Sequence, residues 1–412
     1  MLQILSSSLS LTTLTTSSII LIILLIILTL IWYISASKSP NASPRFPILL
    51  SILRRKYDFI NKGPLELIQD AKVNQLSQRE VYTFTIPVFG KNIVYDASLK
   101  IMQQQLKFVN KGLNLINMKA HVGKIVMEAE EWFSRWPDSG EIDLMKEFSQ
   151  LIILTASRCL LGKEIRENVQ TKFAHLYQQL SDGLCHLQFF FPNAPTLAHR
   201  KCNAARMLIN ARYLVDSMPT DGEITGLLLA ALFAGQHTSN ITSTWMGLLI
   251  IKNQSESMPN LLEEQKQIMD KYHEELSLDS LSEMNLLHAA TQETLRLYPP
   301  LVLLMRKVIE SILYNRYVIS KGNIAVTSPL IAHRISNVYK TPEEFNPKTF
   351  LGRHSCLGEK FAYLQVKTIW SILLRKFDFE LCQEYSEPDY SAFVVEPKGP
   401  CIVKFKRKID SL

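Results

Sequence analysis

The longest apolar stretch of the chain lies near its N-terminus. Residues 1–37 carry no charged side chain, and residues 19–34 are apolar except for Thr29. As a helix, this stretch is long enough to cross the ~30 Å apolar core of a bilayer. Trp32 and Tyr33 stand near its end, where aromatic side chains favour the membrane interface. We therefore predict a membrane anchor over residues 1–37.

A cleavable signal peptide is the alternative for this stretch. Such a peptide has a charged start, a shorter apolar core and a small-residue cleavage site, whereas this chain has an uncharged start and a long apolar run. Residues 38–56 read as a stiff hinge, because they contain Pro40, Pro44 and Pro47. The basic residues of the hinge predict that the bulk of the chain faces the cytoplasm: Lys38, Arg45, Arg54, Arg55 and Lys56.

After the hinge, the spacing of apolar residues is mostly helical. Three- and four-residue spacings predict helices over 118–136 and 145–162. Residues 223–251 are apolar nearly all round, which predicts a buried central helix. Residues 261–276 read as a charged amphipathic helix, and a helix over 284–300 ends at a Pro-Pro pair.

Two segments have a strand-like composition and are predicted to form hairpins. Residues 316–329 are expected to turn at 321–323, and residues 393–406 to form a second hairpin. Because helical patterns predominate and no internal repeat is visible, we expect residues 57–412 to form one domain, mainly α with a minor β part.

Composition narrows the class of protein. The 412 residues are 47% apolar and 20% charged, which is typical of a globular chain. The net charge of +7 is mild and no basic run is interleaved with aromatic residues, so we expect no nucleic-acid partner. The six cysteines are scattered without CxxC spacing, which favours a reducing compartment over a disulfide framework.

The predicted central helix has a polar interruption. Residues 234–240 place a glycine and five polar residues among leucine, isoleucine, alanine and phenylalanine. Buried polar groups cost free energy unless they are hydrogen-bonded, and a glycine weakens a helix by about 1 kcal/mol. Either a bound group approaches the helix closely at this point, or two helices meet through back-bonded Ser and Thr side chains.

Two further stretches carry candidate chemistry. Glu293 and Arg296 face each other at i, i+3 on a predicted helix, although this spacing alone often marks only a solvated pair. Cys356 stands just ahead of another predicted helix, whose N-terminus favours a thiolate. Arg353 and His354 add cationic or hydrogen-bonding groups beside it. Taken alone, this thiol can be redox-active, nucleophilic or structural.

The order of these features resembles the cytochrome P-450 family of haem-thiolate monooxygenases. The resemblance rests on the anchor, the Gly-Thr stretch of the central helix, the ExxR pair ending at Pro-Pro, and the GxxxCxG loop leading into a helix. It implies a cytochrome P-450 fold, incomplete in this chain, and a haem b whose iron is bound by Cys356. His237-Thr238 replaces the usual acid-threonine pair, and this replacement, with the stretch over 81–96, is similar to plant obtusifoliol-type sterol 14α-demethylases.

The resemblance also implies a role for individual residues. Thr238 would organise the hydrogen bonds that deliver protons during oxygen activation, with His237 as a relay, while Glu293 and Arg296 would be structural. The residues implied near the haem propionates are Tyr82, Tyr95, Lys107, Arg306 and His354. The residues implied to line the sterol cavity are Val88, Phe89, Phe233, Ala234 and Leu301 to Met305.

The same resemblance implies substrate, partners and location. We expect a sterol of the obtusifoliol type or a related triterpene, which loses a methyl group as formate over three rounds of NADPH and O2. Electrons would come from NADPH through the FAD and FMN of NADPH–cytochrome P-450 reductase. The anchor then predicts a single-pass protein in the lipid of the endoplasmic reticulum membrane, with a cytoplasmic catalytic domain.

Three junctions depart from the family pattern. Segments that would build the first β-strands and the helices over the substrate mouth are missing near residues 67–82 and 211–226. In front of Cys356, Thr349 stands where the family has an arginine, and the meander that should follow is absent. We therefore expect the buried charge of Glu293 to have Arg296 as its only partner.

Two other functions remain open on the sequence. The chain can be a degenerate, haem-less paralogue that is inactive or acts as a membrane-anchored binding protein. It can also be a cysteine-nucleophile enzyme using Cys356 with His354, but two residues apart in one loop is a poor geometry for that pair.

Overall fold

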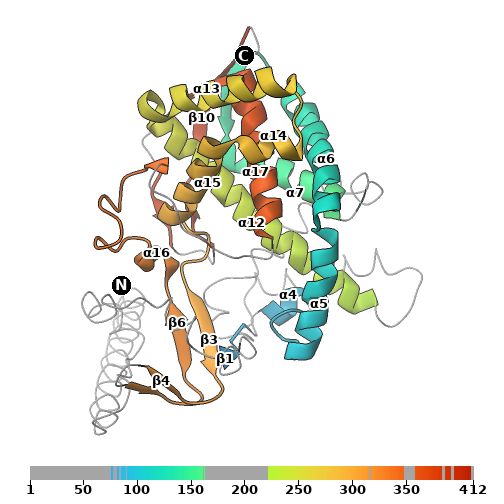
Figure 1. The fold of residues 1–412 in the computed structure, drawn as a ribbon, viewed down its shortest axis with the longest axis vertical. Coiled ribbons are helices and arrows are strands. Elements are labelled where there is room, and N and C mark those ends of the chain that lie inside the picture. Colours follow the sequence, from blue (N-terminus) through green and yellow to red (C-terminus); the bar gives the residue numbers. More distant parts are fainter. Residues whose placement is uncertain are drawn as a thin grey trace, which may run out of the picture. The chain divides into compact units, whose positions relative to one another are not determined.

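The computed structural model of the chain describes residues 76–77, 81–82, 85–89, 91–160, 162, 221–314, 317–347, 358–382, 386–390 and 394–409 (Figure 1). The predicted anchor over 1–37 and the hinge over 38–56 lie outside these residues, and so do Thr349, His354 and Cys356. In the described part of the chain, no helix is long and apolar enough to cross a membrane.

The chain divides into two compact units, residues 1–77 with 306–325 and residues 78–305 with 326–412. In the smaller unit, a three-stranded sheet has the order β1-β3-β6, and β4 pairs with β5. The strands are β1 (Leu76–Ser77), β3 (Leu304–Val308), β4 (Ile312–Tyr314), β5 (Tyr317–Ile319) and β6 (Ile324–Thr327). The ends of β3 and β6 extend into the larger unit.

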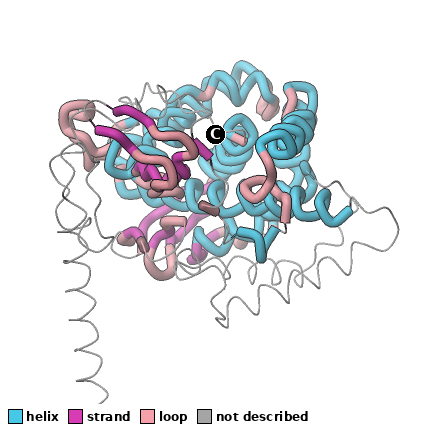
Figure 2. The backbone as a smooth tube through the Cα atoms, turned by 90° about the horizontal axis from the view of Figure 1, so that it is seen from below, coloured by secondary structure: helices cyan, strands magenta, loops and turns pink. Residues whose placement is uncertain are grey.

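Helices make up most of the described chain (Figure 2). Apart from the short helices α4 (Ile86–Phe89) and α16 (Pro329–Ala332), they are α5 (Leu99–Gly112), α6 (Leu115–Ser134), α7 (Leu144–Leu160), α12 (Asp221–Lys252), α13 (Gln254–Tyr272), α14 (Leu278–Glu283), α15 (Asn285–Leu297) and α17 (Glu359–Lys376).

The long helix α12 runs through the middle of the larger unit (Figure 1). It packs against α7, α13, α15 and α17, and residues 239–251 are buried without exception. A helix that is apolar on every side gains most by being surrounded. The core around it includes Trp245, Trp370 and Phe148.

Two small sheets complete the larger unit. In the first, β10 (Ile402–Arg407) lies between β2 (Ser139–Asp143) and β7 (Phe377–Leu381), and both pairings are antiparallel. Val403 and Phe405 alternate along β10 and are buried against the helices. The second sheet pairs β8 (Pro388–Asp389) with β9 (Glu396–Pro397).

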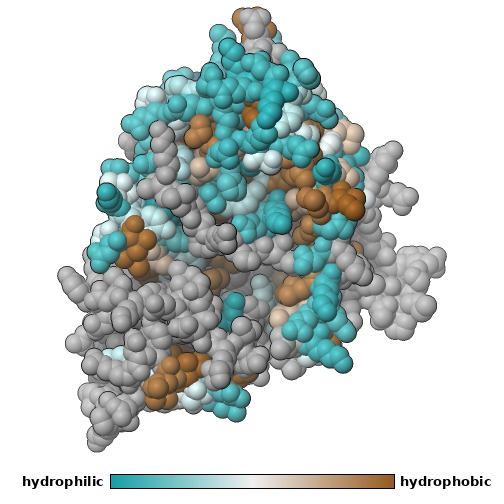
Figure 3. Space-filling model, viewed as in Figure 1, coloured by the Kyte–Doolittle hydropathy of each residue, from teal (hydrophilic) through white to brown (hydrophobic). Residues whose placement is uncertain are grey.

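The structure confirms the five predicted helices, with shifted ends. α13 begins at Gln254, earlier than predicted, and accommodates Pro259 within the helix. Figure 3 shows the largely hydrophilic surface in the region of α13, as its charged pattern predicted. α15 ends at Leu297, before the Pro-Pro pair. The polar stretch over 234–240 does not interrupt α12, which is helical throughout.

Both hairpin predictions were wrong about which strands pair. β5 pairs with β4, and β6 with β3, so Gly322 (φ +89°) is not at the tip of a hairpin. The N–H of Gly322 instead donates to the carbonyl of Val308, the last residue of β3, just before β6 begins at Ile324. At the C-terminus, β9 and β10 enter different sheets: β9 pairs with β8, and β10 lies between β2 and β7.

Candidate active site

One face of α12 is open where the polar residues begin. Ala234 is exposed, while Ala231, Gly235 and Thr238 on the same face are half-buried. A Cβ added at Gly235 would meet nothing within 4 Å. Since alanine and glycine carry almost no side chain, a flat group can approach the backbone of this helix closely.

Thr238 and His237 present different chemistry at this face. The Thr238 hydroxyl donates to Ala234 O over 2.6 Å, which leaves its oxygen able to accept a hydrogen bond. The His237 ring lies 4.8 Å from the Phe233 ring, centroid to centroid. Burial lowers the pKa of His237 to about 4, so the imidazole is neutral at pH 7.

An apolar cluster adjoins the open face. Phe89 of α4 and Phe233 of α12 meet edge to face with centroids 5.4 Å apart, so the structure brings together two of the predicted cavity residues. Met305 belongs to the same cluster, whereas Leu303 is exposed. The side chain of Val88 lies outside the described residues. The other buried members are Val81, Tyr82, Ile93, Ile153, Ala156, Leu229, Ala230 and Leu232.

Gly226 permits the contact between α4 and α12, and the sequence analysis missed it. A Cβ at this position would lie 2.2 Å from the backbone oxygen of Phe89. Only a glycine allows the two backbones to come this close. Its place near the start of a long apolar helix, where glycine is otherwise unfavourable, was the available sequence signal.

Tyr82 and Tyr95, both of which the resemblance places near the haem propionates, lie next to each other in the structure. Their rings stack with centroids 4.7 Å apart. The Tyr82 hydroxyl accepts a hydrogen bond from the backbone N–H of Met305 over 3.1 Å. Lys107 is exposed on α5, and Arg306 is a half-buried residue of β3 in the smaller unit.

Glu293 and Arg296 form a buried pair on α15. Two parallel hydrogen bonds of 2.8 and 2.7 Å join the guanidinium to the carboxylate. Arg296 also donates to three backbone carbonyls, those of His333, Pro342 and Glu344. The pair is therefore a clamp that fixes a distant segment of backbone on α15.

The expectation that Arg296 is the only partner of Glu293 was wrong. The backbone N–H of Asn346 donates to Glu293 Oε1 over 3.0 Å. Arg296 also contacts an aromatic ring: its Cζ lies 5.0 Å from the centre of the Tyr339 ring. A backbone donor leaves no trace in the residue types, so sequence reasoning had no means of finding it.

The predicted helix after the cysteine loop is present. α17 begins at Glu359, and its N-cap is Gly358, whose carbonyl accepts from Ala362 N–H. Gly358 has no side chain with which to cap the helix. The role of Cys356 as iron ligand and that of His354 remain predictions, because both residues lie outside the described part of the chain.

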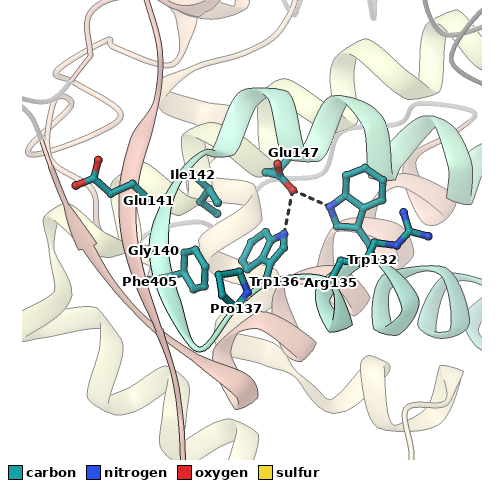
Figure 4. Close-up of a pocket in the computed structure, with 9 residues that line it drawn as sticks. All are labelled: Trp132, Arg135, Trp136, Pro137, Gly140, Glu141, Ile142, Glu147 and Phe405. Atoms are coloured by element: carbon teal, nitrogen blue, oxygen red, sulfur yellow. Dashed lines mark hydrogen bonds between the residues drawn. The ribbon is translucent and has the colours of Figure 1, made fainter.

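A separate pocket of about 280 Å³ lies where α6, β2, α7 and β10 meet (Figure 4). The indole N–H groups of Trp132 and Trp136 both donate to Glu147 Oε2, over 2.8 and 3.0 Å. This carboxylate therefore ties the end of α6 to the start of α7. The pocket is also lined by Arg135, Pro137, Gly140, Glu141, Ile142 and Phe405.

Comparison with known proteins places the fold and the sequence in one family. A family model described as cytochrome P450 matches residues 198–405. An obtusifoliol 14-alpha demethylase from Triticum aestivum is 37% identical over 409 residues, covering 87% of this chain and 90% of its own. A sterol 14-demethylase from Arabidopsis thaliana is 38% identical, covering 82% and 79%. The lanosterol 14-alpha demethylase of Homo sapiens is 34% identical, covering 83% and 76%.

A solved structure supports the same fold. The retinoic acid bound cyanobacterial CYP120A1 matches with a TM-score of 0.73 at 20% identity, over 84% of this chain and 87% of that one. The predicted cytochrome P-450 fold, mainly helical with a minor β part, is confirmed. The chain belongs to the cytochrome P450 family of monooxygenases.

Proposed function

We propose that this chain is a haem-dependent sterol 14α-demethylase that oxidises a sterol of the obtusifoliol type or a related triterpene. The observation that carries the proposal is the open face of α12, with Ala234, Gly235 and Thr238, in a chain 37% identical to an enzyme named obtusifoliol 14-alpha demethylase. Membership of the family implies a haem iron cofactor.

The described residues fit a flat, largely apolar group of this kind. Alanine and glycine on the open face allow close approach to α12, and a Cβ at Gly235 would point into open space. Tyr82, whose hydroxyl accepts from Met305 N–H and whose ring stacks on Tyr95, is a polar side chain in the apolar cluster that adjoins the open face. When bound, haem supplies the activation of dioxygen for insertion of an oxygen atom into a carbon–hydrogen bond.

The chain's own groups then position substrate and protons. The Thr238 oxygen can accept a hydrogen bond at the open face while its hydroxyl donates to Ala234 O. His237, held neutral by burial, has one ring nitrogen that donates and one that accepts, as a relay requires. Phe89 and Phe233 form an apolar, aromatic wall that suits the rings of a sterol.

The remaining parts of the proposal concern partners and location. Electrons come from NADPH through the FAD and FMN of NADPH–cytochrome P-450 reductase, since the chain has no dinucleotide-binding glycine motif of its own. Residues 1–37 anchor the protein in the endoplasmic reticulum membrane, and residues 57–412 form the catalytic domain. Cys356 would supply the thiolate that binds the haem iron, and Lys107, Arg306 and His354 would be partners of the haem propionates.

The deciding measurement is the carbon monoxide difference spectrum of the reduced full-length protein, expressed with a haem precursor. The proposal predicts a Soret band at the red-shifted position of a thiolate ligand, which is lost in Cys356→Ala. A protein that takes up haem should then convert obtusifoliol with the reductase and NADPH, releasing formate. A full-length chain without the red-shifted band contradicts the proposal.

A further inference from the structure

The polar stretch of α12 contains residues that the open face does not explain. Gln236, Ser239, Asn240 and Ser243 recur at i, i+3, i+4 and i+7, so they lie on one side of the helix. Their exposed fractions are 2%, 2%, 3% and 0%. We call these four residues the α12 stripe.

The stripe faces α7. Gln236 Nε2 donates to the hydroxyl and the carbonyl of Ser149, over 3.2 and 3.4 Å. Asn240 Nδ2 lies 3.6 Å from the sulfur of Met145. These contacts place the side-chain amides between the two helices.

The other ends of these amides have no partner. Gln236 Oε1, Asn240 Oδ1 and the hydroxyls of Ser239 and Ser243 are buried, and none has a hydrogen-bond partner in the described part of the chain. If the Gln236 amide were turned around, its oxygen could accept from the Ser149 hydroxyl but would lie about 3.4 Å from the Ser149 carbonyl oxygen, which repels it. A buried polar group without a partner costs free energy, and four of them on one side of one helix need an explanation.

Back-bonding to the helix cannot supply one for the amides. Thr238, Thr242 and Thr244 donate to the carbonyl four residues earlier, whereas the hydroxyls of Ser239 and Ser243 make no such bond in this structure. An amide oxygen needs a donor, and the N–H groups in the middle of a helix are already used. The stripe carries no charged side chain, so a bound ion would have no counter-charge there.

We propose that the α12 stripe binds buried water molecules between α12 and α7. Water donates to the amide oxygens and both donates to and accepts from the serine hydroxyls. Buried waters typically make about three hydrogen bonds to groups that are otherwise unpaired. Gln365 of α17, whose Nε2 reaches Ile152 O and Thr155 Oγ1 of α7 while its Oε1 has no partner, adds a similar acceptor beside the same helix.

Such waters explain why the helix keeps polar residues on two sides. The open face carries Thr238, and the stripe begins with Gln236 in the same turn, so water behind the helix supports the turn that presents the threonine. This inference does not depend on haem, substrate or the proposed function.

Two substitutions test it by the sign of their effect on thermal unfolding of the full-length protein. Asn240→Leu removes the amide at similar size, and Ser243→Ala removes the hydroxyl. If water is bound, it loses partners, and the double variant should melt roughly 3 °C below the wild type. If the stripe is dry, both changes remove unpaired groups and raise helix propensity, so the melting temperature should rise.

A control separates loss of water from loss of any buried hydroxyl. Thr368→Val removes a fully buried hydroxyl that donates to Leu364 O of its own helix over 2.7 Å. This variant should melt within about 1 °C of the wild type. Ser243→Ala shortens a side chain and so cannot overpack the contact between α12 and α7. If Asn240→Leu fails to fold, the change in melting temperature of Ser243→Ala alone tests the proposal. A double variant, or in that case Ser243→Ala, that melts at or above the wild-type temperature overturns the proposal.

Discussion

The buried clamp on α15 allows a quantitative prediction about which partner matters more. Glu293 is 0% and Arg296 is 1% exposed. Arg296→Met would leave the Glu293 carboxylate buried, with the N–H of Asn346 as its remaining donor among the described residues. An unpaired buried charge costs about 3–5 kcal/mol. That is a large share of a total stability of about 5–15 kcal/mol.

Removing the carboxylate should cost less. After Glu293→Gln, Arg296 still donates to the carbonyls of His333, Pro342 and Glu344. The loss is then mainly that of the charge-assisted bonds, about 2 kcal/mol. Arg296→Lys keeps the charge but not the planar fork, so its cost should fall between those of the other two variants.

The assay is urea unfolding of the full-length protein in detergent, followed by tryptophan fluorescence. Arg334→Met is the matched control, because Arg334 pairs over 3.1 Å with Glu343, whose side chain is 71% exposed. This control should lose less than about 1 kcal/mol. The reasoning is refuted if Glu293→Gln costs as much as Arg296→Met, or if Arg296→Met is no worse than the control.

Three further changes test individual contacts, each by urea unfolding. Because the pKa of His237 is lowered from 6.5 to about 4, the unfolded chain takes up a proton that the folded chain refuses, and stability falls as the pH drops from 6.5 to 4. His237→Asn should remove about 3 kcal/mol of this loss, and an unchanged pH dependence would contradict the assignment. Gly226→Ala should destabilise by about 1–3 kcal/mol, since its Cβ would lie 2.2 Å from Phe89 O; an unchanged midpoint would mean the backbones are not in contact. Glu147→Leu should cost about 2 kcal/mol, because it leaves the indole N–H groups of Trp132 and Trp136 without their acceptor. Glu147→Gln should cost less, because the amide oxygen can still accept. The reverse order would argue against the shared hydrogen bonds.

Apolar spacing in the sequence was sufficient to predict five of the long helices, but α5 (Leu99–Gly112) was not predicted. The all-round apolar pattern of residues 223–251 predicts a central helix, and α12 (Asp221–Lys252) is that helix. The polar residues at 234–240 also indicated where the helix is open. They could not show that one side of this stretch is open and another side packs against α7, because the sequence does not indicate where α7 lies.

The pairing of strands could not be predicted in the same way. Glycine is typical of turns, and the positive φ of Gly322 fits this. However, Gly322 lies between β5 and β6, which do not pair with each other. Each strand segment is short, so its partner is decided by contacts with distant parts of the chain. The second partner of Glu293 was not predicted for a related reason, because it is a backbone N–H that lies 53 residues away along the chain.

The backbone clamp changes what the missing family arginine implies. With Thr349 in its place, the Glu293 charge was expected to have Arg296 as its only partner, but Asn346 N–H and Arg296 together supply three hydrogen bonds to the carboxylate. The scaffold on both sides of the cysteine loop therefore does not require an arginine at this position: the clamp holds the chain up to Asn346, and α17 begins at Glu359. Under the proposed function, folding of the scaffold and binding of the Cys356 thiolate to the haem iron are therefore separable properties. A substitution between Asn346 and Glu359 should change the carbon monoxide spectrum without changing the urea midpoint. A substitution in the clamp should lower the urea midpoint. If changes in this loop lowered both together, the loop would be part of the scaffold and the clamp would not be sufficient to hold it.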